Sequence, residues 1–174
     1  MPKRERSIAT RNRILEAAAL EFSRHGFRAA TIANICRRAG TNIASVNYHF
    51  GDKEALYVEA WRQAFRRSYE RHPLLGGIAD DAPAEERLEG WIGSFLKRIT
   101  DPECCDFEIA HKEFANPTGL LSDVIREALE PLSESLRNIL RELLGDGATE
   151  NDIRLCDMSI HSQCMNPVIV GRRH

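Results

Sequence analysis

Signals that end one helix and start the next follow one another closely in the first third of this chain, and they strongly limit how it can fold. Thr31 precedes the segment IANICRRA, Gly40 follows it, Asn42 precedes IASVNYHF, and Gly51 follows that. Thr and Asn side chains cap the free N–H groups at a helix start, whereas glycine adopts the backbone conformations that end one. The pattern therefore predicts two short helices joined by a tight glycine turn.

A longer amphipathic helix is expected on either side of this pair. From about Thr10, apolar side chains recur every three or four residues until Gly26. The first twelve or so residues are polar and basic, and their early part is expected to form a loose arm. Asp52 caps the second long helix, from Lys53 to about Arg71. The first three helices then form a helix-turn-helix unit, in which Ile43 or Val46 reaches the core and the third helix keeps a face free for the major groove of DNA.

The remaining residues have the periodicity of helices and contain no segment with strand periodicity. After a loop at 72–83, the expected helices are Ala84–Thr100, Leu120–Leu144 and Glu150 to about Val168, with a less regular segment at Glu103–Ala115. Pro131 predicts a kink or split in the second of these helices. We therefore expect an all-α fold, with a helix-turn-helix DNA-binding domain at residues 1–52 and a helical regulatory and dimerisation domain at residues 53–174.

Charge is distributed unevenly along the chain. Nine Lys/Arg residues against three Glu give residues 1–50 a formal charge of +6, so the rest of the chain carries −8 of the net −2. A small basic unit attached to an acidic body is typical of a protein that binds nucleic acid through one end. The sequence has no signal peptide and no apolar run long enough to cross a bilayer, so we expect a cytoplasmic protein without a membrane partner.

Evidence for catalysis or for a cofactor is weak. The chain has no G-x-S-x-G stretch, phosphate-binding loop or dinucleotide fingerprint, and we expect neither an enzyme nor a cofactor. His111, Glu113 and His161 lack the spacing of metal ligands, so no metal site is predicted. The five cysteines form no CxxC pair and are expected to be reduced, although the adjacent Cys104 and Cys105 leave thiol sensing open.

The N-terminal stretches RILEAAALEFSRHGFRAATIANICRRAG and SVNYHFGDKEALY resemble the TetR family of bacterial transcriptional regulators. The SVNYHF stretch is most similar to the subgroup with a CerR-like C-terminal domain. The resemblance covers about the first 60 residues, and it implies a helical homodimer that binds operator DNA and has a ligand pocket in its C-terminal helices. Most members continue into another helix of the dimer bundle, which implies either an abbreviated dimer interface here or a longer chain.

The resemblance also implies roles for individual residues. Asn42 to His49 correspond to the recognition helix, and His49, Lys53 and Thr31 occupy positions that contact phosphates. This chain departs from the family at Asn47, where many members have Tyr, although Asn can bind a phosphate or an adenine edge. The full set of expected DNA-binding residues is Thr31, Asn42, Ile43, Ser45, Asn47, Tyr48, His49 and Lys53.

An apolar or amphipathic small-molecule effector is expected in the body, because aromatic residues are dense there without a catalytic motif to explain them. The candidate lining residues are Trp61, Phe65, Trp91, Phe95, Phe114 and Met158. The leading interpretation is a ligand-responsive repressor that binds an inverted-repeat, double-stranded operator as a homodimer. Two alternatives stay open: an adaptor whose helix-turn-helix unit binds other proteins, and a small helical enzyme that uses Cys104 or His111.

Overall fold

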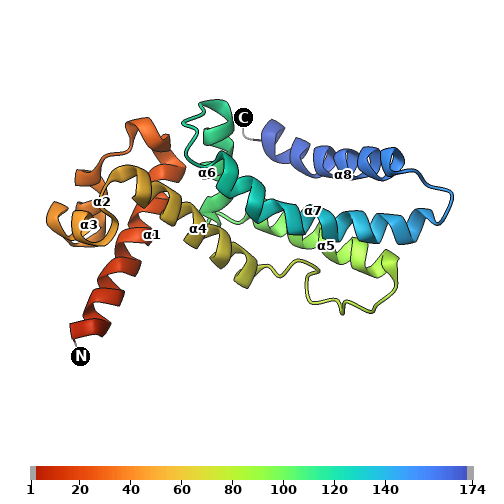
Figure 1. The fold of residues 1–174 in the computed structure, drawn as a ribbon, viewed down its shortest axis with the longest axis horizontal. Coiled ribbons are helices and arrows are strands. Elements are labelled where there is room, and N and C mark those ends of the chain that lie inside the picture. The colour runs from red at the N-terminus through yellow and green to blue at the C-terminus, as the bar shows by residue number, and fades with distance from the viewer. Residues whose placement is uncertain (1–2, 172–174) are drawn as a thin grey trace. The chain divides into compact units, whose positions relative to one another are not determined.

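The computed structural model describes residues 3–171, and the side chains of residues 4–166. This part of the chain contains eight helices and no strand, which confirms the expected all-α fold (Figure 1). None of these helices combines the length and the apolar character that a membrane span requires. The bounds are α1 Lys3–Ala29, α2 Ile32–Ala39, α3 Ile43–Phe50, α4 Lys53–Arg71, α5 Ala84–Thr100, α6 Cys105–Ala115, α7 Ser122–Leu144 and α8 Glu150–Gly171.

The chain divides into two compact units. The first contains the chain up to Ser68 together with Glu103–Ile125, and the second contains Tyr69–Pro102 together with the chain from Arg126 onward. This division differs from the expected boundary at residue 52, because α6 and most of α4 pack with the first three helices. The indole Nε1 of Trp61 on α4, for example, donates to the backbone oxygen of Asp106 on α6 at 3.1 Å.

Helix α1 begins earlier than the sequence pattern suggests. It starts at Lys3, so the expectation of a loose arm before Thr10 is wrong. No glycine or proline interrupts the basic stretch after Lys3, and Glu5 in the first turn interacts favourably with the helix dipole. Gly26 interrupts the helix, as expected, but with φ 71° and ψ 173° instead of the left-handed helical conformation. That combination is essentially restricted to glycine.

The short helices α2 and α3 begin and end where the sequence predicts. The Oγ1 of Thr31 accepts a hydrogen bond from the backbone N–H of Asn34 at 3.2 Å, and the Oδ1 of Asn42 accepts one from that of Ser45 at 2.9 Å. Gly40 separates the two helices with φ 61° and ψ 45°, the left-handed conformation. Local capping chemistry therefore sets the length and the spacing of both helices.

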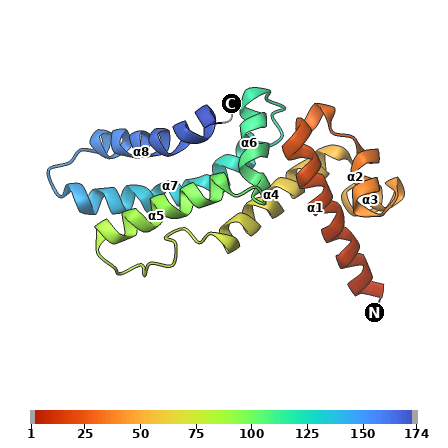
Figure 2. The same ribbon diagram turned by 180° about the vertical axis from the view of Figure 1, so that it is seen from behind.

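A small apolar core joins α2 and α3 to α1, and both Figure 1 and Figure 2 show these helices lying together. Val46 is fully buried, whereas Ile43 is 54 % exposed. Of the two residues that the sequence pattern predicted as alternatives for the core, Val46 is therefore the one that is buried. Burial of Val46 orients α3, because residues on the opposite side of the helix must then face outward. Other fully buried apolar side chains of the same unit include Ile14, Phe22, Ile35 and Leu56.

The later helices are more regular than expected. Residues 105–115 form the regular helix α6 instead of an irregular segment. Helix α7 runs from Ser122 to Leu144 with Pro131 inside it, so the expected split at Pro131 does not occur. The last predicted helix is confirmed as α8, and the final residues 172–174 lie outside the described part of the chain.

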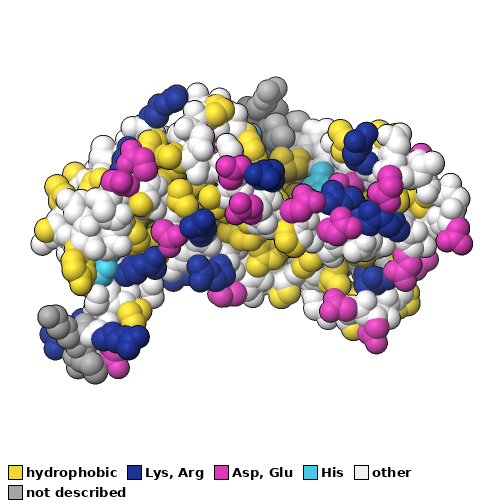
Figure 3. All heavy atoms as spheres, in the orientation of Figure 1, with side chains coloured by type: hydrophobic (Ala, Val, Ile, Leu, Met, Phe, Trp, Pro, Cys, Tyr) yellow, Lys and Arg dark blue, Asp and Glu magenta, His cyan; other side chains and the backbone are white. Residues whose placement is uncertain are grey.

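The second unit has its own core, built by α5, α8 and the part of α7 that follows Ile125. In both ribbon views these helices run alongside one another. Trp91, Leu136, Leu140 and Ile153 are buried together at its centre. On its surface, acidic and basic side chains lie next to one another (Figure 3): Arg137 pairs with Glu130 and Glu134, and Arg141 pairs with Glu134 and Glu150.

The loop before α5 approaches that helix so closely that only glycine fits at position 90. A Cβ atom added to Gly90 would overlap with the carbonyl oxygen of Leu75 and would lie 2.8 Å from the Cγ1 of Ile78. Gly93 lies one turn further along the same helix, and a Cβ atom added there would meet no heavy atom within 4 Å. The two glycines therefore differ in steric surroundings but share a helix.

We expect Gly90→Ala to lower the free energy of unfolding by about 1–3 kcal/mol, because the loop backbone must move to accommodate the methyl group. The matched control, Gly93→Ala, should leave stability unchanged or raise it by up to about 1 kcal/mol, since alanine favours the helix. Urea denaturation followed by circular dichroism measures both effects. Equal stabilities for the two variants would contradict the close approach.

Candidate nucleic-acid interface

One side of α3 is exposed and carries no formal charge. Ile43, Asn47 and Tyr48 are all exposed, and Tyr48 is 81 % exposed, an unusual position for an aromatic side chain. Together with the exposed Ala44 they share a side, because positions three or four residues apart project in similar directions from a helix. Val46 points the opposite way into the core. We call the exposed side the α3 face and define it by Ile43, Ala44, Asn47 and Tyr48.

Two of the predicted DNA-binding residues in α3 have structural roles of their own. The Oδ1 of Asn42 accepts hydrogen bonds from both the backbone N–H and the hydroxyl of Ser45, at 2.9 and 3.1 Å. Asn42 keeps the N–H₂ group of its amide for an external partner, whereas the hydroxyl proton of Ser45 is directed to Asn42. Asn42 and Ser45 therefore shape the start of α3 and lie beside the α3 face, not at its centre.

Lys53 is held in place by an aromatic ring. Its Nζ lies 4.5 Å from the centroid of the Phe27 ring, which follows the interruption at Gly26. A cation–π contact fixes the direction of the side chain without neutralising its charge. His49 is half-buried and lies against its neighbours, with ring centroids 5.0 Å from Tyr48 and 6.1 Å from Phe50. The contact with Phe27 thus positions the Nζ of Lys53 at the start of α4, which follows the end of α3.

Arg11 of α1 also contributes to this region, although the sequence pattern did not single it out. Its guanidinium lies 5.2 Å from the centroid of the Phe50 ring and pairs with Glu59 of α4 at 2.8 Å. Glu59 also pairs with Arg62, and these hydrogen bonds together with the two positive charges outweigh the effect of burial and lower the pKa of Glu59. Arg11 therefore covers Phe50 and connects α1 to α4.

A buried network links α4 to α6 within the same unit. The ring of Tyr57 contacts Phe22 and Phe27, with centroid distances of 4.8 and 5.0 Å. Its hydroxyl donates to the carboxylate of Glu113 on α6 at 3.2 Å. Glu113 also accepts from the backbone N–H groups of Thr118 and Gly119 at 2.9 and 3.1 Å. No local sequence pattern predicts this network, because Glu113 and Tyr57 lie far apart along the chain.

The residues expected to line an effector cavity are not brought together as one set. In the first unit, Trp61 stacks on Phe65 at 5.1 Å between centroids, and in the second, Trp91 stacks on Phe95 at 5.2 Å. Phe114 and Met158 differ from the expectation, because they are 67 % and 58 % exposed. Their positions on α6 and α8 direct them to the surface and not into an enclosed cavity.

None of the five cysteines forms a disulfide bond in the described part of the chain. Cys36, Cys104, Cys105 and Cys164 are buried, and burial raises the pKa of the thiols of Cys36, Cys105 and Cys164. A raised pKa disfavours the reactive thiolate, so these three thiols behave as small apolar residues at neutral pH.

The Tyr57–Glu113 contact predicts a pH-dependent contribution to stability. Burial and the negative charge of Glu113 raise the pKa of the Tyr57 hydroxyl well above its usual value. At neutral pH, Tyr57→Phe should lower the free energy of unfolding by about 1 kcal/mol, the value of one hydrogen bond. Above about pH 10 the unfolded state loses the phenolic proton while the folded state keeps it, so this contribution of Tyr57 falls as the pH rises.

Urea denaturation of both proteins between pH 7 and pH 11 tests this prediction. The difference in unfolding free energy between the original protein and Tyr57→Phe should shrink at the alkaline end of this range. A difference that stays constant would contradict the buried hydrogen bond to Glu113.

Family models match both parts of the chain. The model for bacterial regulatory proteins of the tetR family matches residues 14–60, which include α2, α3 and the start of α4. The model for the C-terminal domain of the HTH-type transcriptional dual regulator CecR matches residues 84–174. This second match confirms the subgroup that was expected from the SVNYHF stretch, with a C-terminal domain of the CecR type.

Curated proteins and solved structures agree with these matches. The probable acrEF/envCD operon repressor of Escherichia coli K12 is 27 % identical over 160 residues, covering 89 % of this chain and 72 % of that protein. The dual regulator CecR of Shigella flexneri is 26 % identical over 173 residues, covering 94 % and 75 %. A TetR family regulator from Agrobacterium tumefaciens has the same fold, with a TM-score of 0.75 at 20 % identity, covering 97 % of this chain and 90 % of that one.

The family matches identify the helix-turn-helix fold of α1–α3 independently of the geometry of the α3 face. Together with the CecR-type match over α5–α8, they cover most of the chain. The chain therefore belongs to the TetR family and is a DNA-binding transcriptional regulator with a C-terminal domain of the CecR type.

Proposed function

We propose that this regulator represses transcription by inserting the α3 face into the major groove of an inverted-repeat operator as a homodimer. The observation that carries the proposal is the composition of that face. Ile43 offers an apolar contact for a thymine methyl group, and Asn47 offers a donor and an acceptor for an adenine edge. The absence of charge on the face suits base edges, since phosphates are bound by cations at its border.

Phosphate contacts are assigned to residues around the α3 face. Lys53, held over Phe27, presents its ammonium group beyond the end of α3, and the free N–H groups at the start of α2 lie next to the exposed Thr31. His49 and the hydroxyl of Tyr48 supply further donors. The basic residues of the N-terminal turns of α1, which are helical here, add positive charge to the same unit. These contacts fix the position of α3 but carry no base information.

The homodimer follows from the family relationship and from the symmetry of the expected site. Two identical DNA-binding units related by a twofold axis require half-sites in inverted repeat, separated by one helical turn of DNA or a multiple of it. Leu155 and Met158 on α8 are large exposed apolar residues separated by three positions, so they lie on one side of that helix. We assign this side of α8 to the dimer interface.

An effector is proposed for the second unit, at the buried indole ring of Trp91. The indole N–H of Trp91 is buried and has no hydrogen-bond partner among the described residues. Leaving such a group unpaired costs about 1–3 kcal/mol, so a bound molecule with an acceptor would stabilise this site. The rings of Phe95 and His161 lie against Trp91, with the His161 centroid at 5.1 Å, and they supply apolar and edge contacts. We therefore expect an aromatic or amphipathic effector with a hydrogen-bond acceptor.

The salt dependence of operator binding tests whether DNA is the partner. Neutralising several phosphates releases counterions, so affinity should fall by about 10³-fold or more between 50 and 200 mM salt. Fluorescence anisotropy with a labelled operator fragment from the promoter of the regulator's own gene measures this fall. Affinity that is independent of salt would contradict the proposal and favour an adaptor that binds proteins through Ile43 and Tyr48.

Two substitutions separate base contacts from phosphate contacts. Asn47→Ala should change the order of preference among operator variants, by about 1–3 kcal/mol at the base it contacts. Lys53→Ala should weaken binding to all sequences by a similar factor and reduce the salt slope by about one. Competition binding with a set of single-base operator variants measures both.

Asn42→Ala is a less informative variant, because loss of the helix cap lowers helix stability by about 1 kcal/mol in addition to any effect on DNA. If Lys53→Ala changed the base preference and Asn47→Ala had no effect on it, the assignment of the α3 face would be wrong.

A further inference from the structure

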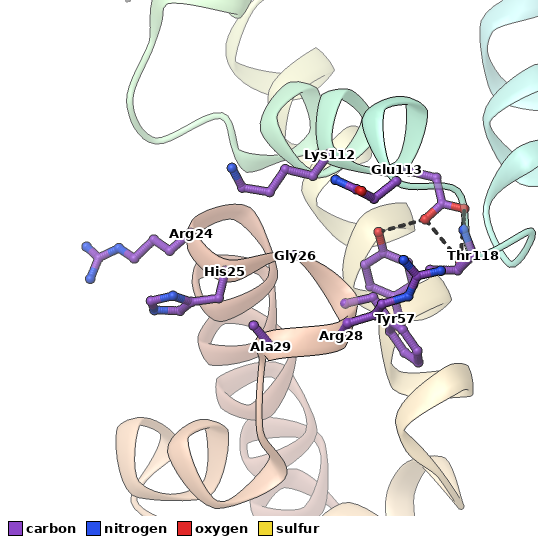
Figure 4. A pocket seen from close by; sticks show the side chains of 11 residues that line it. Arg24, His25, Gly26, Arg28, Ala29, Tyr57, Lys112, Glu113 and Thr118 are labelled. Atoms are coloured by element: carbon purple, nitrogen blue, oxygen red, sulfur yellow. Dashed lines mark hydrogen bonds between the residues drawn. The ribbon is translucent and has the colours of Figure 1, made fainter.

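A pocket of about 310 Å³ opens beside Gly26 in the first unit, and its lining includes no residue of the α3 face. The end of α1, Tyr57 of α4 and the end of α6 surround it (Figure 4). Volumes near 300 Å³ are at the lower end of those of small-molecule sites. The pocket therefore suits a molecule of only a few non-hydrogen atoms.

Positive charge dominates the lining of this pocket. Arg24 and Arg28 come from the end of α1, and Lys112 comes from α6. None of these three forms an ion pair with a carboxylate of the described residues, whereas Arg11, Arg67, Arg87, Arg137 and Arg141 all do. Arg28 donates one hydrogen bond, a long one of 3.4 Å to the backbone oxygen of Pro117, which leaves most of its N–H groups for another acceptor.

The one carboxylate in the lining does not neutralise these cations. Glu113 is buried, and its oxygens already accept from the hydroxyls of Tyr57 and Thr118 and from the backbone N–H groups of Thr118 and Gly119. As Figure 4 shows, these bonds hold Glu113 toward Tyr57 and the loop after α6. Glu113 therefore builds a wall of the pocket, while Arg24, Arg28 and Lys112 supply a local excess of positive charge.

Lys112 lies over Gly26 at the edge of the pocket. A Cβ atom added to Gly26 would lie 3.6 Å from the Cδ of Lys112, so the aliphatic part of this side chain passes next to the glycine. A lysine side chain that lies along the surface in this way keeps its ammonium group accessible to a ligand.

We propose that this pocket binds a small anion with two negative charges, a dicarboxylate or a phosphate group, through Arg28 and Lys112, with Arg24 at its edge. Arginine suits planar or tetrahedral oxyanions because two of its N–H groups can bind two oxygens at once, and lysine adds a point charge. Figure 4 shows the ends of Lys112 and Arg28 on different sides of the pocket, so the flexible Lys112 side chain must turn toward Arg28 for the anion to bridge the end of α1 to α6. The site is separate from the proposed effector site and does not depend on operator binding.

Calorimetric titration of the full chain without DNA tests the proposal, with succinate and inorganic phosphate as separate probes. We expect at least one of them to bind and to raise the melting temperature, while the uncharged 1,4-butanediol does neither. The probe that binds distinguishes a carboxylate site from a phosphate site. The upper concentration for each probe is roughly 10 mM, ten times a weak dissociation constant of ~1 mM. If neither probe binds up to that concentration, the proposal is overturned.

Charge variants locate the site. Arg28→Gln and Lys112→Gln should each weaken the bound probe by about tenfold or more, since each removes a charge-assisted hydrogen bond. Arg66→Gln is the matched control, because Arg66 is an exposed arginine of α4 outside the pocket. The affinity of this variant for the probe should equal that of the original protein. Equal weakening in all three variants would show general charge attraction and overturn the site.

Two further measurements keep these variants interpretable. Arg28→Lys retains the charge and should restore part of the affinity, and circular dichroism melting without ligand reveals any variant that fails to fold. The salt dependence of operator affinity, measured for the same variants, tests whether these cations bind DNA instead of a small anion. If Arg28→Gln and Lys112→Gln left anion binding intact but lowered the salt slope of operator affinity, the cations would belong to the DNA contact and the proposal would be wrong.

Discussion

The carboxylate of Glu113 is buried on α6 and is matched by donors from two other segments: the hydroxyl of Tyr57 on α4, and the groups of Thr118 and Gly119 in the loop after α6. A buried charge is tolerated only with such partners, so the loop must close over α6 and Tyr57 must face it. Tyr57 in turn fixes Phe27, and Phe27 carries Lys53. The position of a cation assigned to DNA thus depends on a network that begins at α6.

Local chemistry explains which parts of the fold could be predicted from the sequence. Thr31, Gly40 and Asn42 act within one helical turn of their own positions, so their roles as caps and turn were predictable without knowledge of the rest of the chain. The start of α1 was missed because helix propensity, not amphipathic periodicity, extends it to Lys3. The choice of Val46 over Ile43 as the core residue required the positions of α1 and α2, which no local pattern contains.

In the candidate nucleic-acid interface, too, local features were predictable and contacts between distant residues were not. The α3 face could be expected from the short helix that carries it, whereas the contact between Lys53 and Phe27 and the cover of Phe50 by Arg11 join residues far apart in sequence. The candidate effector residues were chosen for their aromatic character alone, and that criterion does not distinguish buried Trp61 and Trp91 from exposed Phe114 and Met158. Aromatic density indicates apolar surface but does not show which molecule or core covers it.

The separation between the buried and exposed sides of α3 has a consequence for how this regulator can evolve. Its helix is held by Val46 and by the Asn42 cap, whereas Ile43, Asn47 and Tyr48 make few demands on the fold. Exchanges at such exposed positions usually change stability by less than about 0.5 kcal/mol. With the proposed role of the α3 face, duplicated copies of the gene can diverge toward new operators through single exchanges at these three positions, without passing through unfolded intermediates.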